Sequence, residues 1–268
     1  MSIHTTSIIG KRDKNEDKII TITNIDNSDP TKSPINFFCI FDGHGGNGVS
    51  KILADSFPKI FLNKELYSHP YKIRFINEIF SSVQELLRTK YTNIATNSGS
   101  TCLACSMFKY KKNKYIQVIN VGDCRCVLCR DLMAIPITKD HKPNWPEEKL
   151  RIEKLGGKII FDGFDYRIDD LSVSRAFGDL TSQPYVAPIP DIFNVRLKKE
   201  DKFIVLACDG LWDIMSNQDV VNFILINFYD LKTGKRLDGR INIAKQLAEY
   251  AVKKGSTDNI SIILVFLD

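Results

Sequence analysis

The sequence has no hydrophobic run long enough to cross a membrane, and it has no low-complexity tract. A membrane-spanning helix needs about 20 consecutive apolar residues, whereas the apolar runs of this chain are short, and Phe37–Phe41 is typical. The segment Met1–Lys11 lacks the charged head and apolar middle of a signal peptide. Ser2 stands where N-myristoylation requires glycine. We therefore expect a soluble, intracellular protein of the cytoplasm or nucleus that does not act on membranes.

The sequence also has no large excess of charge of one sign. The 37 Lys and Arg residues nearly balance the 32 Asp and Glu residues, and the formal charge of +5 is too small and too dispersed to indicate nucleic-acid binding. The 7 cysteines are an odd number and lie mostly within apolar runs, which is typical of reduced, buried thiols. No linker rich in Pro, Gly or Ser divides the 268 residues. We expect a single domain over residues 1–268, and a monomer.

Short apolar runs and helical periodicity predict the elements of the fold. The predicted strands are Ile35–Phe41, Thr101–Phe108, Tyr115–Val121, Cys124–Cys129, Phe203–Cys208 and Ile260–Phe266. The predicted helices are Val49–Phe61, Tyr71–Thr89, Glu147–Leu155, Asp219–Phe228 and Ile241–Lys253. Many strands are apolar on both faces and need cover on both sides. Because strands and helices do not alternate regularly, an α+β fold of two face-to-face sheets with helices outside fits best.

Smaller signals refine this prediction. Asn217 precedes one predicted helix as its N-cap, and Gly255 stops another. The stretch 139–172 is the most irregular part of the chain. We expect it to form a flap-like excursion beside the active site.

Aspartates recur at the ends of the predicted strands. Asp42, Asp123 and Asp209 each follow such a strand, and Asp258 precedes the last one. Burying several converging carboxylates costs several kcal/mol for each unless something neutralises them. Mg²⁺ and Mn²⁺ prefer oxygen ligands and would do so, and Gly43 lets the backbone turn so that its carbonyl can also reach a metal. Each aspartate alone fits an ordinary turn, but the four together favour a metal cluster.

Other polar residues near these aspartates suggest an active site. His44 lies in a glycine-rich turn, and its pKa near neutrality suits proton donation to a leaving oxygen. The guanidinium of Arg12 suits phosphate binding, and Glu16 and Asp17 suit the binding of metal-bound waters. Without the metal cluster, His44 would be an incidental histidine, and the segment with Arg12, Glu16 and Asp17 would be a charged surface loop.

Short motifs follow one another across nearly the whole chain. They are Arg12…Asn15-Glu16-Asp17, Phe41–Gly46, Ser98–Thr101, Asn120–Arg125, Asp140–Pro143, Glu148…Arg151-Ile152 with Gly156-Gly157, Leu171–Asp179, Ala207–Asp213 and Ser256–Asn259. In this order they resemble the motifs of the protein phosphatase 2C family, the metal-dependent serine/threonine protein phosphatases. Each motif is weak alone, but the ordered set leaves little room for chance.

The resemblance implies a β-sandwich of two antiparallel sheets flanked by α-helices. It also implies two Mg²⁺ or Mn²⁺ ions in the active site. Asp42 would bridge both ions, the carbonyl of Gly43 would bind one of them, and Asp209 and Asp258 would complete the other. A looser third metal position would involve two further carboxylates, those of Asp123 and Asp213.

The same resemblance implies hydrolysis of phosphoserine and phosphothreonine in phosphorylated proteins. A hydroxide bridging the metals would attack phosphorus in line, without a covalent enzyme intermediate. Arg12 would hold the substrate phosphate, and His44 would protonate the leaving oxygen. Glu16 and Asp17 would orient metal-bound waters.

Two departures from the family pattern lie beside these residues. Cys124 stands where serine is usual, and Asp169-Asp170 stand where an Asn-Gly-like turn is usual. They leave the implied metal ligands intact and bear on the shape of the flap and on substrate choice. The alternative function is that of a pseudophosphatase that only binds phosphoproteins. Loss of a metal aspartate would signal it, and the implied ligands are all present.

Other motifs suggest unrelated functions. Gly43–Gly48 matches the dinucleotide-binding G-x-G-x-x-G, but a second helical segment follows where that fold needs a parallel strand, and Asp42 would repel a pyrophosphate. Cys124…Arg130 has the C-x₅-R spacing of cysteine-based phosphatases, but the residues between them contain no glycine and have the pattern of a strand.

Two C-x₂-C pairs have the spacing of a structural zinc site. They are Cys102-x₂-Cys105 and Cys126-x₂-Cys129. The residues within each pair are apolar strand residues, and strand residues three apart point to opposite faces. We therefore favour buried thiols over zinc ligands at these positions.

Overall fold

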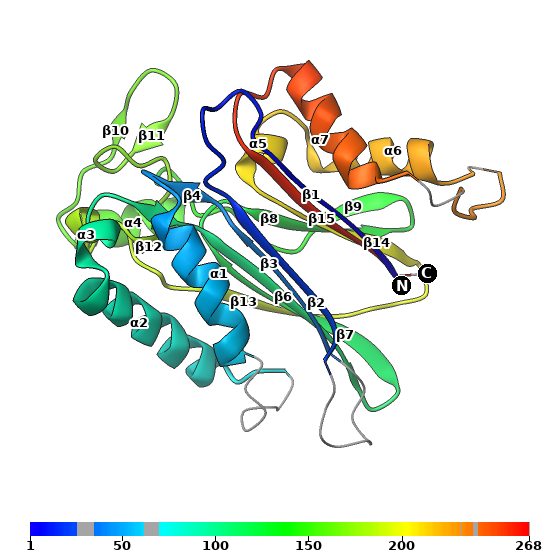
Figure 1. Ribbon diagram of the computed structural model, residues 1–268, viewed down its shortest axis with the longest axis horizontal. Coiled ribbons are helices and arrows are strands. Elements are labelled where there is room, and N and C mark those ends of the chain that lie inside the picture. Colours follow the sequence, from blue (N-terminus) through cyan, green and yellow to red (C-terminus); the bar gives the residue numbers. More distant parts are fainter. Residues whose placement is uncertain (26–34, 62–69, 231, 238–240, 268) are drawn as a thin grey trace.

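Two five-stranded antiparallel sheets form the centre of the structure, a computed structural model that describes residues 1–25, 35–61, 70–230, 232–237 and 241–267. In spatial order the first sheet consists of β1 (Ser2–Ile8), β15 (Ile260–Phe266), β14 (Asp201–Ala207), β8 (Arg125–Arg130) and β9 (Met133–Pro136). The second consists of β13 (Asp191–Arg196), β7 (Asn113–Val121), β6 (Cys102–Tyr110), β3 (Ile35–Phe41) and β2 (Lys18–Ile25). The two chain ends lie side by side, where β1 pairs with β15 (Figure 1).

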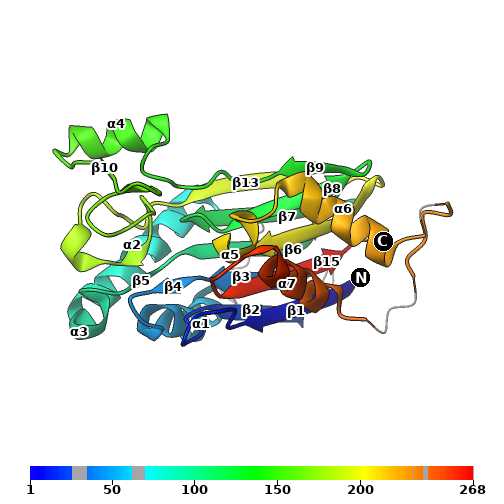
Figure 2. The same cartoon turned by 90° about the horizontal axis from the view of Figure 1, so that it is seen from above.

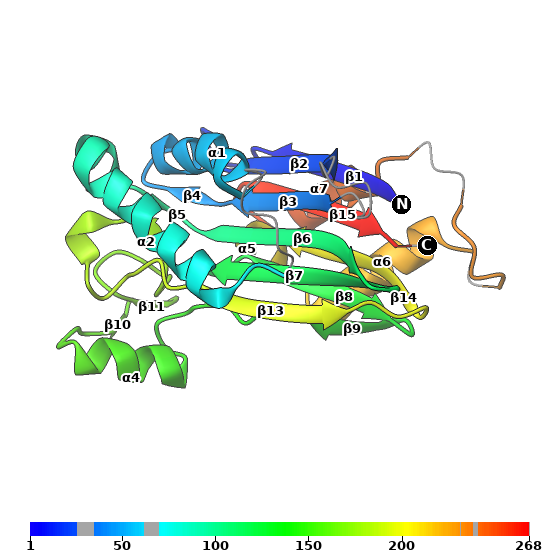
Figure 3. The ribbon, with the colours of Figure 1, turned by 90° about the horizontal axis from the view of Figure 1, so that it is seen from below.

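Helices cover the outer face of each sheet. The helices α6 (Asn217–Phe228) and α7 (Ile243–Lys254) pack on the first sheet with the short α5 (Asp209–Trp212). The helices α1 (Gly48–Phe61) and α2 (Ile73–Lys90) pack on the second sheet, as Figure 3 shows. A third apolar cluster fills the space between the sheets. These four layers confirm the α+β sandwich that the sequence predicted.

Strand β3 shows why the central strands are apolar on both faces. Phe37, Cys39 and Phe41 pack with the helices α1 and α2, whereas Phe38 and Ile40 pack between the sheets. Successive strand residues point to opposite faces, so a central strand of a four-layer fold has no face for polar side chains. Burial of each such phenylalanine or isoleucine contributes about 1.5–3 kcal/mol.

The ends of two helices test the capping predictions. Gly255 ends α7 in the left-handed conformation with φ 114°, which confirms its predicted role. The N-cap of α6 is Ser216 and not Asn217, because the Ser216 hydroxyl accepts from the backbone N–H of Asp219 in a capping box. Asn217 is instead the first helical residue, and its side-chain oxygen accepts a hydrogen bond from Arg125.

Smaller elements gather at one end of the sandwich. A three-stranded sheet there contains β12 (Phe177–Gly178), β5 (Gly99–Ser100) and β4 (Gly43–His44). Within the stretch 139–172 lie α4 (Pro146–Lys154) and the hairpin of β10 (Ile160–Phe161) and β11 (Tyr166–Arg167). Figure 2 shows α4 and β10 projecting beyond that end of the sheets. No helix of the described residues is long and apolar enough to span a membrane.

Candidate metal centre

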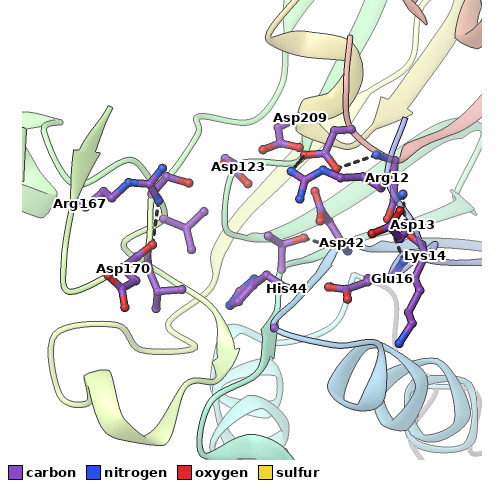
Figure 4. A pocket seen from close by; sticks show the side chains of 18 residues that line it. Arg12, Asp13, Lys14, Glu16, Asp42, His44, Asp123, Arg167, Asp170 and Asp209 are labelled. Atoms are coloured by element: carbon purple, nitrogen blue, oxygen red, sulfur yellow. Dashed lines mark hydrogen bonds and ion pairs between the residues drawn. The ribbon is translucent and has the colours of Figure 1, made fainter. Parts of the chain in front are cut away.

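A cleft of about 510 Å³ opens at this end of the sandwich and contains most of the residues singled out from the sequence (Figure 4). The predicted site residues that line it are Arg12, Glu16, Asp42, Gly43, His44, Asp123, Asp209 and Asp258. Asp17 and Asp213 are not among its lining residues. Asp17 is buried beneath it, within electrostatic reach of Asp42 and Asp258. Asp213 follows Asp209 by one helical turn, and its N–H donates to the Asp209 carbonyl at 2.8 Å.

The antiparallel order of the strands explains why these aspartates meet. Strands β3 and β7 both pair with β6, so they run in the same direction and end at the same edge of their sheet. Asp42 directly follows β3, and Asp123 follows β7 through a turn at Gly122, whose φ is +104°. In the other sheet β14 and β15 are antiparallel neighbours. Asp209 after β14 and Asp258 before β15 are therefore brought to one edge.

Asp42 and Asp209 form the core of the candidate centre. Their carboxylates and the Cys208 thiol offer ligand atoms that all lie within 4.8 Å of one another. Burial, and then repulsion from Asp209, raises the pKa of Asp42 well above its usual range. Burial, and then repulsion from Asp123, does the same to the pKa of Asp209. The site thus holds more negative charge than its own side chains neutralise, and oxygen donors of this kind fit Mg²⁺ or Mn²⁺.

The buried carboxylate of Asp17 is a second indication of a metal site. Its side chain is buried, and neither carboxylate oxygen makes a hydrogen bond of normal geometry with the described residues. Burial is the main reason that its pKa rises to about 6. The side chains of Ser261 and Cys208 lie near enough to lower this pKa, but they do not offset the burial. A buried carboxylate with so little compensation is costly, and its place beside Asp42 is typical of a residue that acts on a metal through bound water.

Gly43 permits a close backbone approach that a side chain would block. A Cβ atom at this position would lie 2.5 Å from the carbonyl oxygen of Glu16 and 2.9 Å from the Ser50 hydroxyl. The Glu16 side chain in turn accepts from the N–H of Gly46 at 3.1 Å. The backbone of Asp42 is fixed as well, because its carbonyl accepts from the N–H of Thr101 at 2.9 Å.

His44 is oriented by an acidic partner. Its Nε2 lies 2.8 Å from Asp179 Oδ2. Gly99 lies on β5 between β4, which carries His44, and β12, which directly precedes Asp179, and a side chain at Gly99 would collide with both residues. Burial alone would lower the pKa of His44, but the hydrogen bond and charge of Asp179 outweigh it and raise the pKa overall. The imidazole is thus held in one orientation and in a setting that favours its protonated form.

Two cationic side chains contact the aspartates directly. Arg12 Nη2 lies 2.7 Å from Asp258 Oδ2, and the arginine side chain is 59% exposed at the cleft. Lys142 Nζ lies 2.5 Å from the buried Oδ2 of Asp123. Burial alone would lower the pKa of Lys142, but the charges of Asp123 and Asp209 raise it.

Comparison with known proteins decides the family. The family model described as "Protein phosphatase 2C" matches residues 2–260. This chain belongs to the protein phosphatase 2C family. A PP2C-like domain-containing protein of Acanthamoeba polyphaga mimivirus is 47% identical over 172 residues, which cover 58% of this chain and 96% of that protein. Probable protein phosphatase 2C 7 of Oryza sativa subsp. japonica is 35% identical over 273 residues, which cover 99% of this chain and only 65% of the rice protein.

Two solved structures share the fold of this chain. The crystal structure of serine-threonine phosphatase 2C from Toxoplasma gondii matches with a TM-score of 0.75 at 22% identity, over 98% of this chain and 94% of that one. The structure of a C. elegans sex determining protein matches with a TM-score of 0.86 at 22% identity, over 100% of this chain and 65% of that one.

The phosphatase 2C fold removes the structural basis of the rival motifs. Gly43–Gly48 spans β4 and the start of α1, and all strand pairs among the described residues are antiparallel, so no dinucleotide fold exists here. The residues between Cys124 and Arg130 form β8 and not a phosphate-binding loop, and burial raises the pKa of the Cys124 thiol. The paired cysteines face different layers: Cys105 and Cys126 lie between the sheets, whereas Cys102 and Cys129 face opposite helical layers.

Three residues of the phosphatase 2C centre had no role in the sequence analysis. They are Asp179, Lys142 and Cys208. All three lie inside motifs that carried the resemblance, which was a usable signal, but nothing in their local pattern named a partner. Cys208 also ends a predicted strand, and its pattern is that of a buried strand residue.

Proposed function

We propose that this chain is an active serine/threonine protein phosphatase that uses two divalent cations, Mg²⁺ or Mn²⁺, to hydrolyse phosphoserine and phosphothreonine in proteins. The observation that carries the proposal is the convergence of Asp42 and Asp209. Burial raises both pKa values, and repulsion from neighbouring carboxylates raises them further, from Asp209 in the case of Asp42 and from Asp123 in the case of Asp209. Neither carboxylate forms a salt bridge with a cationic side chain of the described residues. A pair of cations would remove this repulsion.

The residues around these carboxylates fit a pair of hard cations. Asp42 would bridge the two cations, with the Gly43 carbonyl on one and Asp209 and Asp258 on the other. Bound there, the cations would supply an activated water near neutral pH and offset charge on the phosphoryl oxygens. Glu16 and Asp17 would hold the surrounding waters in place.

Arg12 and His44 would handle the substrate. The exposed guanidinium of Arg12 already pairs with an anionic group at the cleft, and the same fork suits the oxygens of a phosphate. His44 would give its proton to the departing seryl or threonyl oxygen. Because Asp179 engages Nε2, the proton available to the substrate would be the one on Nδ1.

The excursion 139–172 would supply one wall of the substrate site. Arg167 and Asp170 line the cleft opposite Asp42 and Asp209, as the left side of Figure 4 shows. Leu171 lines the cleft as well. A protein segment entering the cleft with its phosphorylated residue would therefore contact this wall. The departure at Asp169-Asp170 lies at this point, which makes it the place where substrate choice would differ from that of relatives.

Hydrolysis of a phosphothreonine peptide in Mn²⁺, in Mg²⁺ and in chelator tests the proposal. We expect activity with either metal, none in chelator, and none in Asp42→Asn or Asp209→Asn. The matched control is Asp55→Asn, an exposed aspartate on α1 away from the cleft, which should behave as wild type. Wild-type rates in either ligand variant would refute the ligand assignment. Tight phosphopeptide binding without hydrolysis would favour the pseudophosphatase alternative.

A further inference from the structure

A lysine lies among the carboxylates of the candidate metal centre. Lys142 Nζ donates to Asp123 Oδ2 at 2.5 Å, and the two side chains are only 18% and 2% exposed. Asp209 and Asp213 are its other acidic neighbours. The ammonium group thus lies beside the carboxylates that the family resemblance gives to a third metal.

The backbone holds this lysine in place from both sides. The N–H of His141 donates to the Gly122 carbonyl at 3.0 Å, and the N–H of Gly122 donates to His141 Nδ1 at 3.0 Å. Gly122 directly precedes Asp123, so this reciprocal pair fixes Lys142 and Asp123 relative to each other. On the other side, Asp140 accepts two hydrogen bonds from Arg125, at 3.0 and 2.6 Å.

A second set of contacts anchors the same segment to the rest of the fold. His141 Nε2 lies 3.2 Å from Asp191 Oδ2, and Asp191 also pairs with Arg175 at 3.0 Å. Arg175 continues to Glu148 on α4 at 2.6 Å. The backbone that carries Lys142 is thus already ordered, so only its side chain loses conformational entropy when it pairs with the carboxylate.

The balance of charge in the centre indicates a role for Lys142. Two divalent cations would be balanced by the carboxylates of Asp42, Asp209 and Asp258 together with one metal-bound hydroxide, which leaves the buried Asp123 without a counter-charge. We infer that the Lys142 ammonium is the counter-ion of Asp123, so that this chain holds two divalent cations and admits a third only when Lys142 withdraws. The inference rests on the proposed function, because it presupposes the metal pair.

Counting bound Mn²⁺ by isothermal titration calorimetry, with electron paramagnetic resonance of free Mn²⁺ as a second readout, tests this inference. We expect two sites in the wild type and three in Lys142→Met, with the third at least about tenfold tighter than any weak third site of the wild type. Adding Asp123→Asn to Lys142→Met should return the count to two. Lys139→Met is the matched control, because Lys139 lies in the same segment but pairs with Glu147 at the surface.

The possible outcomes separate the two proposals. A wild type that binds no Mn²⁺ would overturn the proposed function. A wild type with three sites of similar affinity, or Lys142→Met that keeps two, would overturn only the role of Lys142. If Lys142→Met does not fold, the wild type crystallised with excess Mn²⁺ gives the answer. Anomalous peaks at two positions with Lys142 on Asp123 are expected, and a third peak on Asp123 would contradict the inference.

Discussion

The ion pairs of Glu148 allow a stability prediction whose size follows from the structure. This carboxylate lies on α4 with a side chain only 5% exposed, and it accepts from Arg151 at 2.9 Å and from Arg175 at 2.6 Å. Burial alone would raise the pKa of Glu148, but the two arginines lower it from its ordinary value of 4.5 to about 2. A difference of this size corresponds to about 3 kcal/mol of preference for the charged form in the folded state.

We expect Glu148→Gln to lower the free energy of unfolding by about 2–3 kcal/mol at pH 7, because solvent screening reduces the full value and two arginines lose their shared partner. Since the folded pKa lies below the unfolded one, the contribution is complete above about pH 4.5 and disappears as the pH falls toward 2. The difference between wild type and variant should therefore shrink over that range.

Urea unfolding in chelator, at several pH values from 7 down to 3, measures this difference. The control is the preceding residue, because Glu147 is 69% exposed and pairs only with the surface residue Lys139 among the described residues. Glu147→Gln should change the free energy of unfolding by less than about 0.5 kcal/mol. Equal effects of the two variants, or a Glu148→Gln effect that does not depend on pH, would refute the reasoning.

Two further predictions concern the chemistry and the core. His44→Ala should slow hydrolysis of phosphoserine and phosphothreonine peptides more than that of an aryl phosphate, because an aryl oxide leaves without a proton donor; equal losses on both substrates would rule out the general-acid role. Phe57→Ala should lower the free energy of unfolding by about 3–5 kcal/mol, because Phe57 is 0% exposed and contacts the rings of Phe41, Phe80 and Phe177. Phe164→Ala, at a position 95% exposed, is its control, and similar unfolding curves for the two variants would contradict the packing argument.

Within the two five-stranded sheets, the strands that the sequence did not predict share one property. β1, β2, β9 and β13 are the edge strands of the two sheets, whereas each predicted strand lies inside a sheet. A central strand of this fold is covered on both faces and is apolar throughout, which is a strong pattern. An edge strand is partly exposed and mixes polar and apolar residues, as Lys18–Ile25 does. Its place in the sheet is decided by backbone pairing with a distant segment, and such pairing leaves little trace in the local sequence.

The residues of the candidate site also fall into those that the sequence could predict and those that it could not. Asp42, Asp123, Asp209 and Asp258 could be singled out because each adjoins a predicted strand, and antiparallel pairing then brings such strand ends to one edge. Their cleft could be anticipated from that pattern, but the partners that set its charge could not.

Those partners are specified only by the folded chain. Asp179 reaches His44 across 135 residues of sequence, and it does so because Gly99 leaves room between them. Lys142 meets Asp123 because the backbone of His141 pairs with that of Gly122. Each contact pairs a cationic or ionisable side chain with a buried carboxylate. Loss of either side chain of such a pair would leave a buried charge without a partner. The carboxylates of the site can therefore be predicted from the sequence. The side chains that compensate their charge cannot, because they come from distant segments that only the fold brings into contact.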